Sequence, residues 1–108
     1  MKPLAFSAGM LVTGVVFGQE TWLDCSNKAG LELKVGFDQQ ARWVEVRSKE
    51  EILHARDSYV TPGKVFADLG VSTLDINRVS GSFILTHRTG EVRNGECVRA
   101  AKPAAGKF

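Results

Sequence analysis

Residues 31–37 read Leu-Glu-Leu-Lys-Val-Gly-Phe, a stretch in which every second residue is apolar. Successive side chains of a β-strand point to opposite faces of the sheet, so one face of this stretch would carry all four apolar side chains, Leu31, Leu33, Val35 and Phe37. A polar link at 38–40 leads into a second alternating stretch at 42–47, where Val44 and Val46 share a face. The two stretches predict an antiparallel hairpin with one buried face.

Further short strands are expected downstream, separated by turn signals every 8–12 residues or so. The turn signals are pairs that tolerate or preset turn geometry, namely Pro62-Gly63, Ser80-Gly81, Thr89-Gly90 and Asn94-Gly95. The strands predicted between them cover residues 58–61, 64–69, 73–79, 82–87 and 96–99. This pattern predicts a mainly β protein, a small antiparallel β-barrel or sandwich.

One segment, Ser48–Arg56, is ambiguous. Ser48 and Glu51 match a capping box, with Ser48 as the N-cap and Glu51 three residues later, which favours one short helix. The alternative is a strand over residues 52–56.

The first 18 residues have the pattern of a secretory signal peptide. Lys2 precedes a charge-free segment, Leu4–Phe17, and Val16-Phe17-Gly18 fits a cleavage site. Cleavage would leave a 90-residue chain with a single β domain at 19–99, a flexible basic tail at 100–108 and no stable membrane span. The expected location is periplasmic or secreted, and the alternative is an uncleaved N-terminal anchor.

Export would place the only two cysteines, Cys25 and Cys97, in an oxidising compartment, where we expect them to form a disulfide. That bond would tie the first strand to the last and protect the sheet edges. The alternative role, a pair of metal-ligating thiolates, lacks the clustered spacing of a zinc site.

Charge is unevenly distributed along the mature chain. Residues 19–77 carry 7 basic and 10 acidic side chains, whereas residues 78–108 carry 6 basic and 2 acidic ones. The basic third therefore suggests an acidic partner, either a protein or an envelope component, and its density is too low for a nucleic-acid binder. The candidate partner-binding residues lie in the predicted turns and beside them: Arg78, Ser80, Gly81, Ser82, Arg88 and Arg93.

Two resemblances involve the same part of the chain. Ile76, Arg78 and Ser80-Gly81, followed by Gly95 and Cys97, resemble an I-x-R-x-[ST]-G…G-x-C element of small exported bacterial β-proteins, most of them without an assigned activity. The chain is also similar in size, export signal and disulfide use to periplasmic inhibitors of C-type lysozyme, which are β-barrels. In that family a Ser-Gly-x-x-Tyr loop enters the lysozyme cleft; here Ser80-Gly81 begins the motif and Ile84 occupies the Tyr position.

These features favour an exported, non-enzymatic binding protein without a cofactor, of which an inhibitor of a cell-wall hydrolase is the most concrete form. The alternative is a small hydrolase or metal-binding protein that uses His54, Asp57 and His87. Trp22 and Trp43 allow two interpretations as well, since each could fill the core or mark a recognition patch.

We expect the exported protein to begin at Gln19, because the charge-free segment and Val16-Phe17-Gly18 direct cleavage after Gly18. Intact-mass measurement of the protein purified from the periplasm or medium checks this. A full-length mass in the soluble fraction would contradict the assignment.

Overall fold

The structure, a computed structural model, describes residues 20–40 and 42–103 of the chain, and within these ranges it contains strands and no helix. The predicted signal peptide, residues 1–18, lies outside the described residues, as do residues 104–108 of the predicted tail. The strands are β2 (Glu20–Ser26), β3 (Glu32–Asp38), β4 (Trp43–Arg47), β5 (Ile52–His54), β6 (Asp57–Val60), β7 (Lys64–Asp68), β8 (Ser72–Asn77), β9 (Ser82–His87) and β10 (Val92–Ala100).

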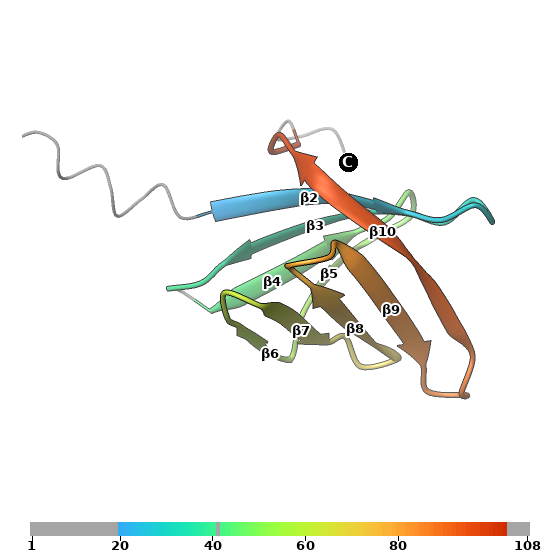
Figure 1. Ribbon diagram of the computed structural model, residues 1–108. Helices are drawn as coiled ribbons and strands as arrows, with labels where there is room; N and C mark the ends of the chain where they lie inside the picture. Colours follow the sequence, from blue (N-terminus) through green and yellow to red (C-terminus); the bar gives the residue numbers. More distant parts are fainter. Residues whose placement is uncertain (1–19, 41, 104–108) are drawn as a thin grey trace, which may run out of the picture.

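All nine strands of the described residues belong to one antiparallel sheet, in the order β5-β4-β3-β2-β10-β9-β8-β7-β6. The sheet curls into a half-barrel (Figure 1). Neighbouring strands in the sheet are consecutive in the sequence, with the exception of β2 and β10. The first and last strands are thus paired, and the mainly β, barrel-like fold expected from the sequence is confirmed.

The sheet bends sharply along β10, because this strand changes partner midway. Its first half pairs with β9 and its second half with β2, and Glu96 lies opposite Ser82 on one side and Ser26 on the other. Gly95 permits the bend: a Cβ at this position would overlap the carbonyl oxygen of Ser26 and lie 2.8 Å from the Phe83 ring. The prediction of a hairpin turn at Asn94-Gly95 is therefore wrong. Both residues lie inside β10, where the missing side chain of Gly95 allows neighbouring strands to pack closely.

The chain also bends between β5 and β6, the two outermost strands of the sheet, which are separated by only two residues. Ala55 N donates to Val44 O of β4 at 3.0 Å, and Arg56 N donates to Asp68 O of β7 at 2.8 Å. The chain thus passes directly from one edge of the sheet to the other, and β6 touches β4. Strands that change sheets in this way form the corners of a folded-over sheet.

The short helix suggested for residues 48–56 is not formed. Ser48 Oγ accepts hydrogen bonds from the backbone N–H groups of Glu50 and Glu51, both at 3.3 Å, and Ser48 N donates to Glu51 O at 2.9 Å. The capping residue stabilises a tight turn instead, after which β5 pairs with β4. Serine supports either arrangement, and here strand pairing decides between them.

The apolar side chains gather on the concave face of the sheet, where the sequence alternation places them. Val35, Phe37, Val65, Leu74, Ile76 and Phe83 are each exposed by 1% or less, and they pack with Leu33, Val44 and Val46. The predicted disulfide lies among them: Cys25 of β2 is directly opposite Cys97 of β10, and the two are bonded. A disulfide at this position indicates an oxidising environment.

A second apolar contact lies on the convex face, where Trp22 covers Gly36. The indole of Trp22 is 5% exposed and lies outside the concave core. It packs against Trp43, with ring centroids 6.4 Å apart, and the Arg47 guanidinium lies 5.1 Å from its ring centroid. A Cβ on Gly36 would come within 2.5 Å of the indole, so the missing side chain makes room for Trp22.

We expect the Cys25→Ala and Cys97→Ala double variant to lose about 4 kcal/mol of unfolding free energy. The bond joins residues with a sequence separation of 72 and therefore restricts the unfolded chain strongly. Urea titration gives the midpoint and slope that measure this loss. Reduction of the unmodified protein serves as the control and should lower the midpoint equally. An unchanged midpoint in both experiments would contradict the stabilising role of the bond.

We expect Gly36→Ala to destabilise the protein by about 1–3 kcal/mol, because the added methyl group displaces the Trp22 indole. The chain contains only two tryptophans, so the displacement should also shift the fluorescence emission to longer wavelength. Gly63→Ala is the matched control, since a Cβ there meets no atom within 4 Å and the backbone φ is not positive. Equal stability of the two variants would show that Gly36 is not required for packing.

Candidate functional site

The turns of the half-barrel fall at two ends, because consecutive strands are antiparallel. The turns at 39–42, 61–63 and 78–81 lie at one end, called here the Arg78 end, together with the start of β2 and the end of β10. The turns at 27–31, 48–51, 69–71 and 88–91 lie at the other, the His87 end. The candidate partner-binding residues divide between these two ends.

The β8–β9 turn at the Arg78 end is held by a set of local hydrogen bonds. Gly81 N donates to Asn77 O at 2.8 Å, and Asn77 Oδ1 accepts from the N–H groups of Val79 and Ser80, both at 2.9 Å. Gly81 has a φ of 87°, which glycine adopts at little cost. The hairpin turn predicted at Ser80-Gly81 is thus present, and Val79 projects from its tip with 86% of its surface exposed.

The Arg78 side chain points back over the end of the core. Its guanidinium carbon lies 5.1 Å from the centroid of the Phe37 ring, and its Nη1 donates to Thr61 O at 2.6 Å. The same nitrogen is 3.5 Å from Gln39 Oε1. These contacts come from three different turns or strands, so Arg78 is fixed in one orientation rather than extended freely into solvent.

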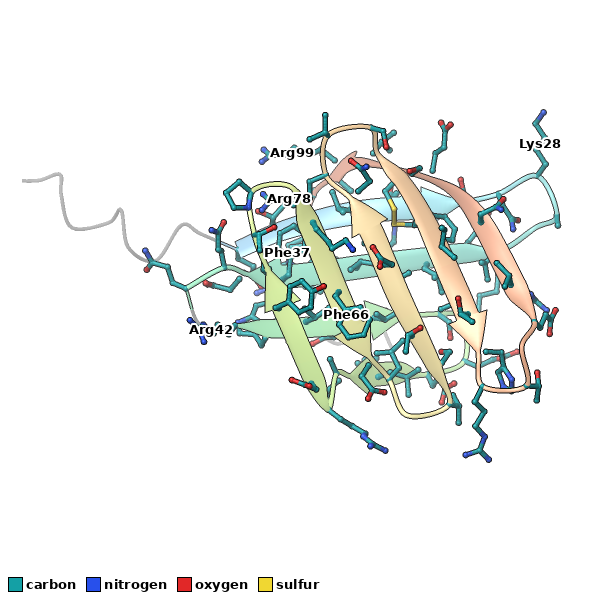
Figure 2. The ribbon with its side chains drawn as sticks, turned by 60° about the horizontal axis from the view of Figure 1, so that its bottom comes forward. Lys28, Phe37, Arg42, Phe66, Arg78 and Arg99 are labelled. Carbon is teal, nitrogen blue, oxygen red and sulfur yellow. A yellow bond between two sulfur atoms is a disulfide. The ribbon has the colours of Figure 1, made fainter. Side chains whose placement is uncertain are left out.

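Two more arginines accompany Arg78 at this end, as Figure 2 shows. Arg99 lies near the end of β10, two residues after Cys97 and on the same face of the strand, and Arg42 lies in the β3–β4 turn with a φ of 61°. None of the three makes an ion pair with a carboxylate of residues 20–40 or 42–103. The Arg78 end therefore carries three guanidinium charges that these ranges leave without a charged partner.

A pocket of about 200 Å³ opens between the β8–β9 turn, β2 and β10. It is called here the Arg78 pocket. Its lining is mixed: Leu23, Phe37, Ile76 and the disulfide residue Cys97 contribute carbon atoms, and Thr21, Asn77, Arg78, Gly81 and Arg99 contribute polar atoms. Phe37, Ile76 and Cys97 belong to the core, so the pocket lies at the end of the core, with Arg78 and Arg99 in its lining.

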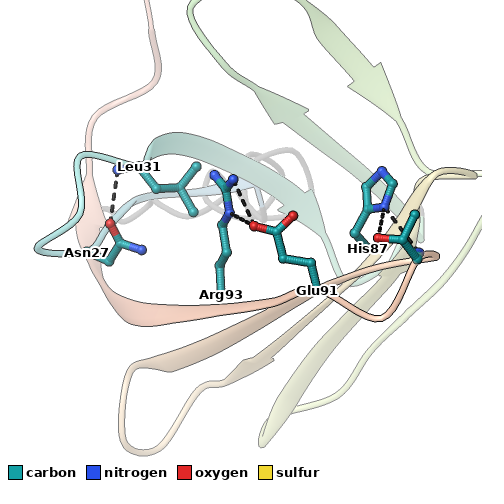
Figure 3. A network of polar contacts seen from close by, with 6 residues as sticks. Asn27, Leu31, His87, Glu91 and Arg93 are labelled. Carbon is teal, nitrogen blue, oxygen red and sulfur yellow. Dashed lines mark hydrogen bonds and ion pairs between the residues drawn. The ribbon is translucent and has the colours of Figure 1, made fainter.

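The structure divides the six candidate partner-binding residues predicted from the sequence. Arg78, Ser80 and Gly81 lie in the β8–β9 turn and Ser82 begins β9 directly after it, with Ser80 Oγ and Ser82 Oγ 2.9 Å apart. Arg88 and Arg93 lie at the His87 end, separated from the turn by the full length of β9. Arg93 donates from Nε and Nη2 to Glu91 Oε2, both at 3.1 Å, so its charge is already paired (Figure 3).

The three residues of the alternative enzyme or metal hypothesis do not gather in one site. His54 is on β5, with Nδ1 3.8 Å from Glu45 Oε1, whereas His87 is at the end of β9 and its Nδ1 lies 2.9 Å from Thr89 Oγ1. Asp57 starts β6 and is opposite Asp68. Within the described ranges, no group of three or more His, Cys, Asp or Glu side chains could hold a metal ion.

A second candidate surface surrounds the tryptophan pair on the convex face. Trp22 and Trp43 line a hollow of about 270 Å³ with Glu45, Arg47 and His54, and Lys102 closes it from the chain beyond β10. Its charges are internally paired, since Arg47 contacts Glu45 and Lys102 Nζ lies 3.4 Å from Glu20 Oε1. Trp43 alternates with the buried Val44 and Val46 along β4, so it faces away from the core, and it packs on Trp22.

Two residues of the Arg78 end, Arg42 and Arg99, were not among the sequence candidates. Arg99 could have been found from its spacing to Cys97, since residues two apart in a strand share a face. Arg42 had no such signal, because its position depends on how the β3–β4 turn meets the other turns.

The described residues contain no helix that is long and apolar enough to cross a membrane. Comparison with protein-family models, with curated proteins and with solved structures found no match to this chain, so its function has to be argued from the geometry.

Proposed function

We propose that this protein is an exported binding protein that engages an acidic surface of a partner through the Arg78 end. The supporting observation is that Arg42, Arg78 and Arg99 gather there without an ion-pair partner in the described residues. A guanidinium group recognises carboxylates with paired hydrogen bonds, so an acidic partner would supply the missing charges.

The β8–β9 turn has the properties of a recognition loop. Its backbone is fixed by the bonds to Asn77, and its tip presents Val79, an apolar side chain in the midst of polar neighbours. A loop that is already ordered loses little conformational entropy when it binds, which favours affinity. The exposed Val79 would add apolar contact area next to the charge of Arg78.

The most concrete form of this proposal is an inhibitor of a cell-wall hydrolase. Glycosidases that cut polysaccharides use a pair of carboxylates in an open cleft, and such a cleft is an acidic, concave target. A projecting turn that carries an arginine and an apolar tip is complementary to it in shape and in charge. The sequence resemblance to lysozyme inhibitors points in the same direction, although Ile84, at the family's Tyr position, lies in strand β9, outside the turn.

We expect the Arg78→Glu and Arg99→Glu double variant to bind its partner about 10- to 100-fold more weakly than the unmodified protein, because charge reversal replaces attraction by repulsion. The partner is first recovered by pull-down from an envelope extract, and affinities are then measured at two salt concentrations. In parallel, lysis of a peptidoglycan suspension by a C-type lysozyme measures inhibition.

The matched control is Lys28→Glu with Arg88→Glu, which makes the same change of charge at the His87 end. Both residues are exposed, and neither has an ion-pair partner in the described residues. We expect this variant to retain binding. If it loses affinity while the Arg78 and Arg99 variant does not, the assignment to the Arg78 end is wrong.

A further inference from the structure

We infer that the Arg78 pocket is a receptor for a single carboxylate group on a short aliphatic stem, such as an Asp or Glu side chain of the partner. This inference rests on the proposed function and specifies the group that the Arg78 end recognises. It follows from the size of the pocket, from its walls and from the donors on its rim.

The size of the pocket selects a side chain rather than a whole small molecule. Its volume of about 200 Å³ lies below the range of roughly 300–1,000 Å³ that is typical of sites for small ligands. A partner that inserts one side chain fills such a space without requiring the core to open.

The walls select an aliphatic stem. Leu23, Phe37 and Ile76 supply the carbon part of a lining that also includes Thr21 and Asn77, and the Cys25–Cys97 bond joins the two strands that contribute Leu23 and Cys97. Methylene groups gain free energy when they leave water for such a surface, whereas a free inorganic anion gains nothing from it. The walls therefore distinguish an acidic side chain from phosphate or sulfate.

The rim selects a carboxylate. Arg78 donates to Thr61 O and to Gln39 Oε1 from the same nitrogen, Nη1, and these two bonds do not use its Nε and Nη2 donors. Arg99 lines the same pocket and makes no ion pair with a described carboxylate. Two guanidinium groups beside a partly apolar lining form stronger hydrogen bonds to a carboxylate than they would in open water, because the local dielectric is lower.

The orientation of Arg78 makes the pocket a prepared site. Phe37 lies beneath its guanidinium and Thr61 O anchors one edge, so the remaining donors are held in place before any ligand arrives. Arg78 thus covers the core in the free protein and offers donors to the ligand in the complex. Loss of its side chain would uncover Phe37, and Arg99 is therefore the better residue to substitute.

The experiment is an NMR titration of the ¹⁵N-labelled mature protein with propionate, which has the carboxylate and the stem of an acidic side chain. Propionamide is the neutral ligand of the same shape, and inorganic phosphate is the anion without a stem. We expect propionate to cause saturable shifts of amide signals near the pocket, including those of Thr21 and Gly81. Propionamide and phosphate should leave these signals unchanged at the same concentrations.

Two variants complete the test. Arg99→Gln should weaken propionate binding about tenfold, because it removes a charged hydrogen-bond donor from the rim. Arg88→Gln makes the same chemical change at the His87 end and should have no effect. Equal shifts with propionamide, equal or tighter binding of phosphate, or an unchanged affinity in Arg99→Gln would each overturn the inference.

The outcomes also separate this inference from the proposed function. If propionate binds at the pocket but charge reversal leaves partner binding unchanged, the pocket is a carboxylate receptor and the partner does not dock at the Arg78 end. If charge reversal abolishes partner binding but propionate does not bind, the partner docks at the Arg78 end and the pocket is not a carboxylate receptor.

Discussion

The pairing of β2 with β10 is the contact on which the rest of the structure depends. It joins the first described strand to the last, and the Cys25–Cys97 bond fixes its register. Without this pair the chain would be an open meander with two long edges, which is a poor arrangement for so short a chain. The same pair determines the rim of the Arg78 pocket, because Arg99 follows Cys97 by two residues and faces the same side. The disulfide thus stabilises the fold and also fixes the strand that carries the Arg99 charge.

Most strands could be predicted from the sequence, because alternation is a local signal and the concave core follows it closely. The errors arose where tertiary packing decided between two local possibilities. Ser48 supports a helix cap or a turn equally well, and pairing of β5 with β4 selects the turn. Asn94-Gly95 would form a tight hairpin in isolation, but Gly95 is needed where β10 passes close to Ser26 and Phe83. Neither choice can be read from neighbouring residues alone.

The candidate site was predicted in part, for a similar reason. Arg78 and Ser80-Gly81 were found from their place in a turn, which is a local property. Arg88 and Arg93 were grouped with them because they are close in sequence and share the same charge, yet β9 carries the chain to the opposite end of the sheet before they occur. Arg42 and Arg99 join Arg78 only through the folding of the sheet. A cluster built from three separate turns and strands has no continuous signature in the sequence.

The ion pair between Lys102 and Glu20 has a consequence for how the molecule can be handled. It holds the two ends of the described chain side by side at the Arg78 end, next to the residues argued to bind a partner. A fusion partner attached close to Glu20 or Lys102 would therefore lie beside that surface. Because the ends are adjacent, a short linker could join them and new termini could be opened in the exposed turn at 88–91. Such a circular permutant would attach to a column or a sensor chip from the His87 end and leave the Arg78 end free.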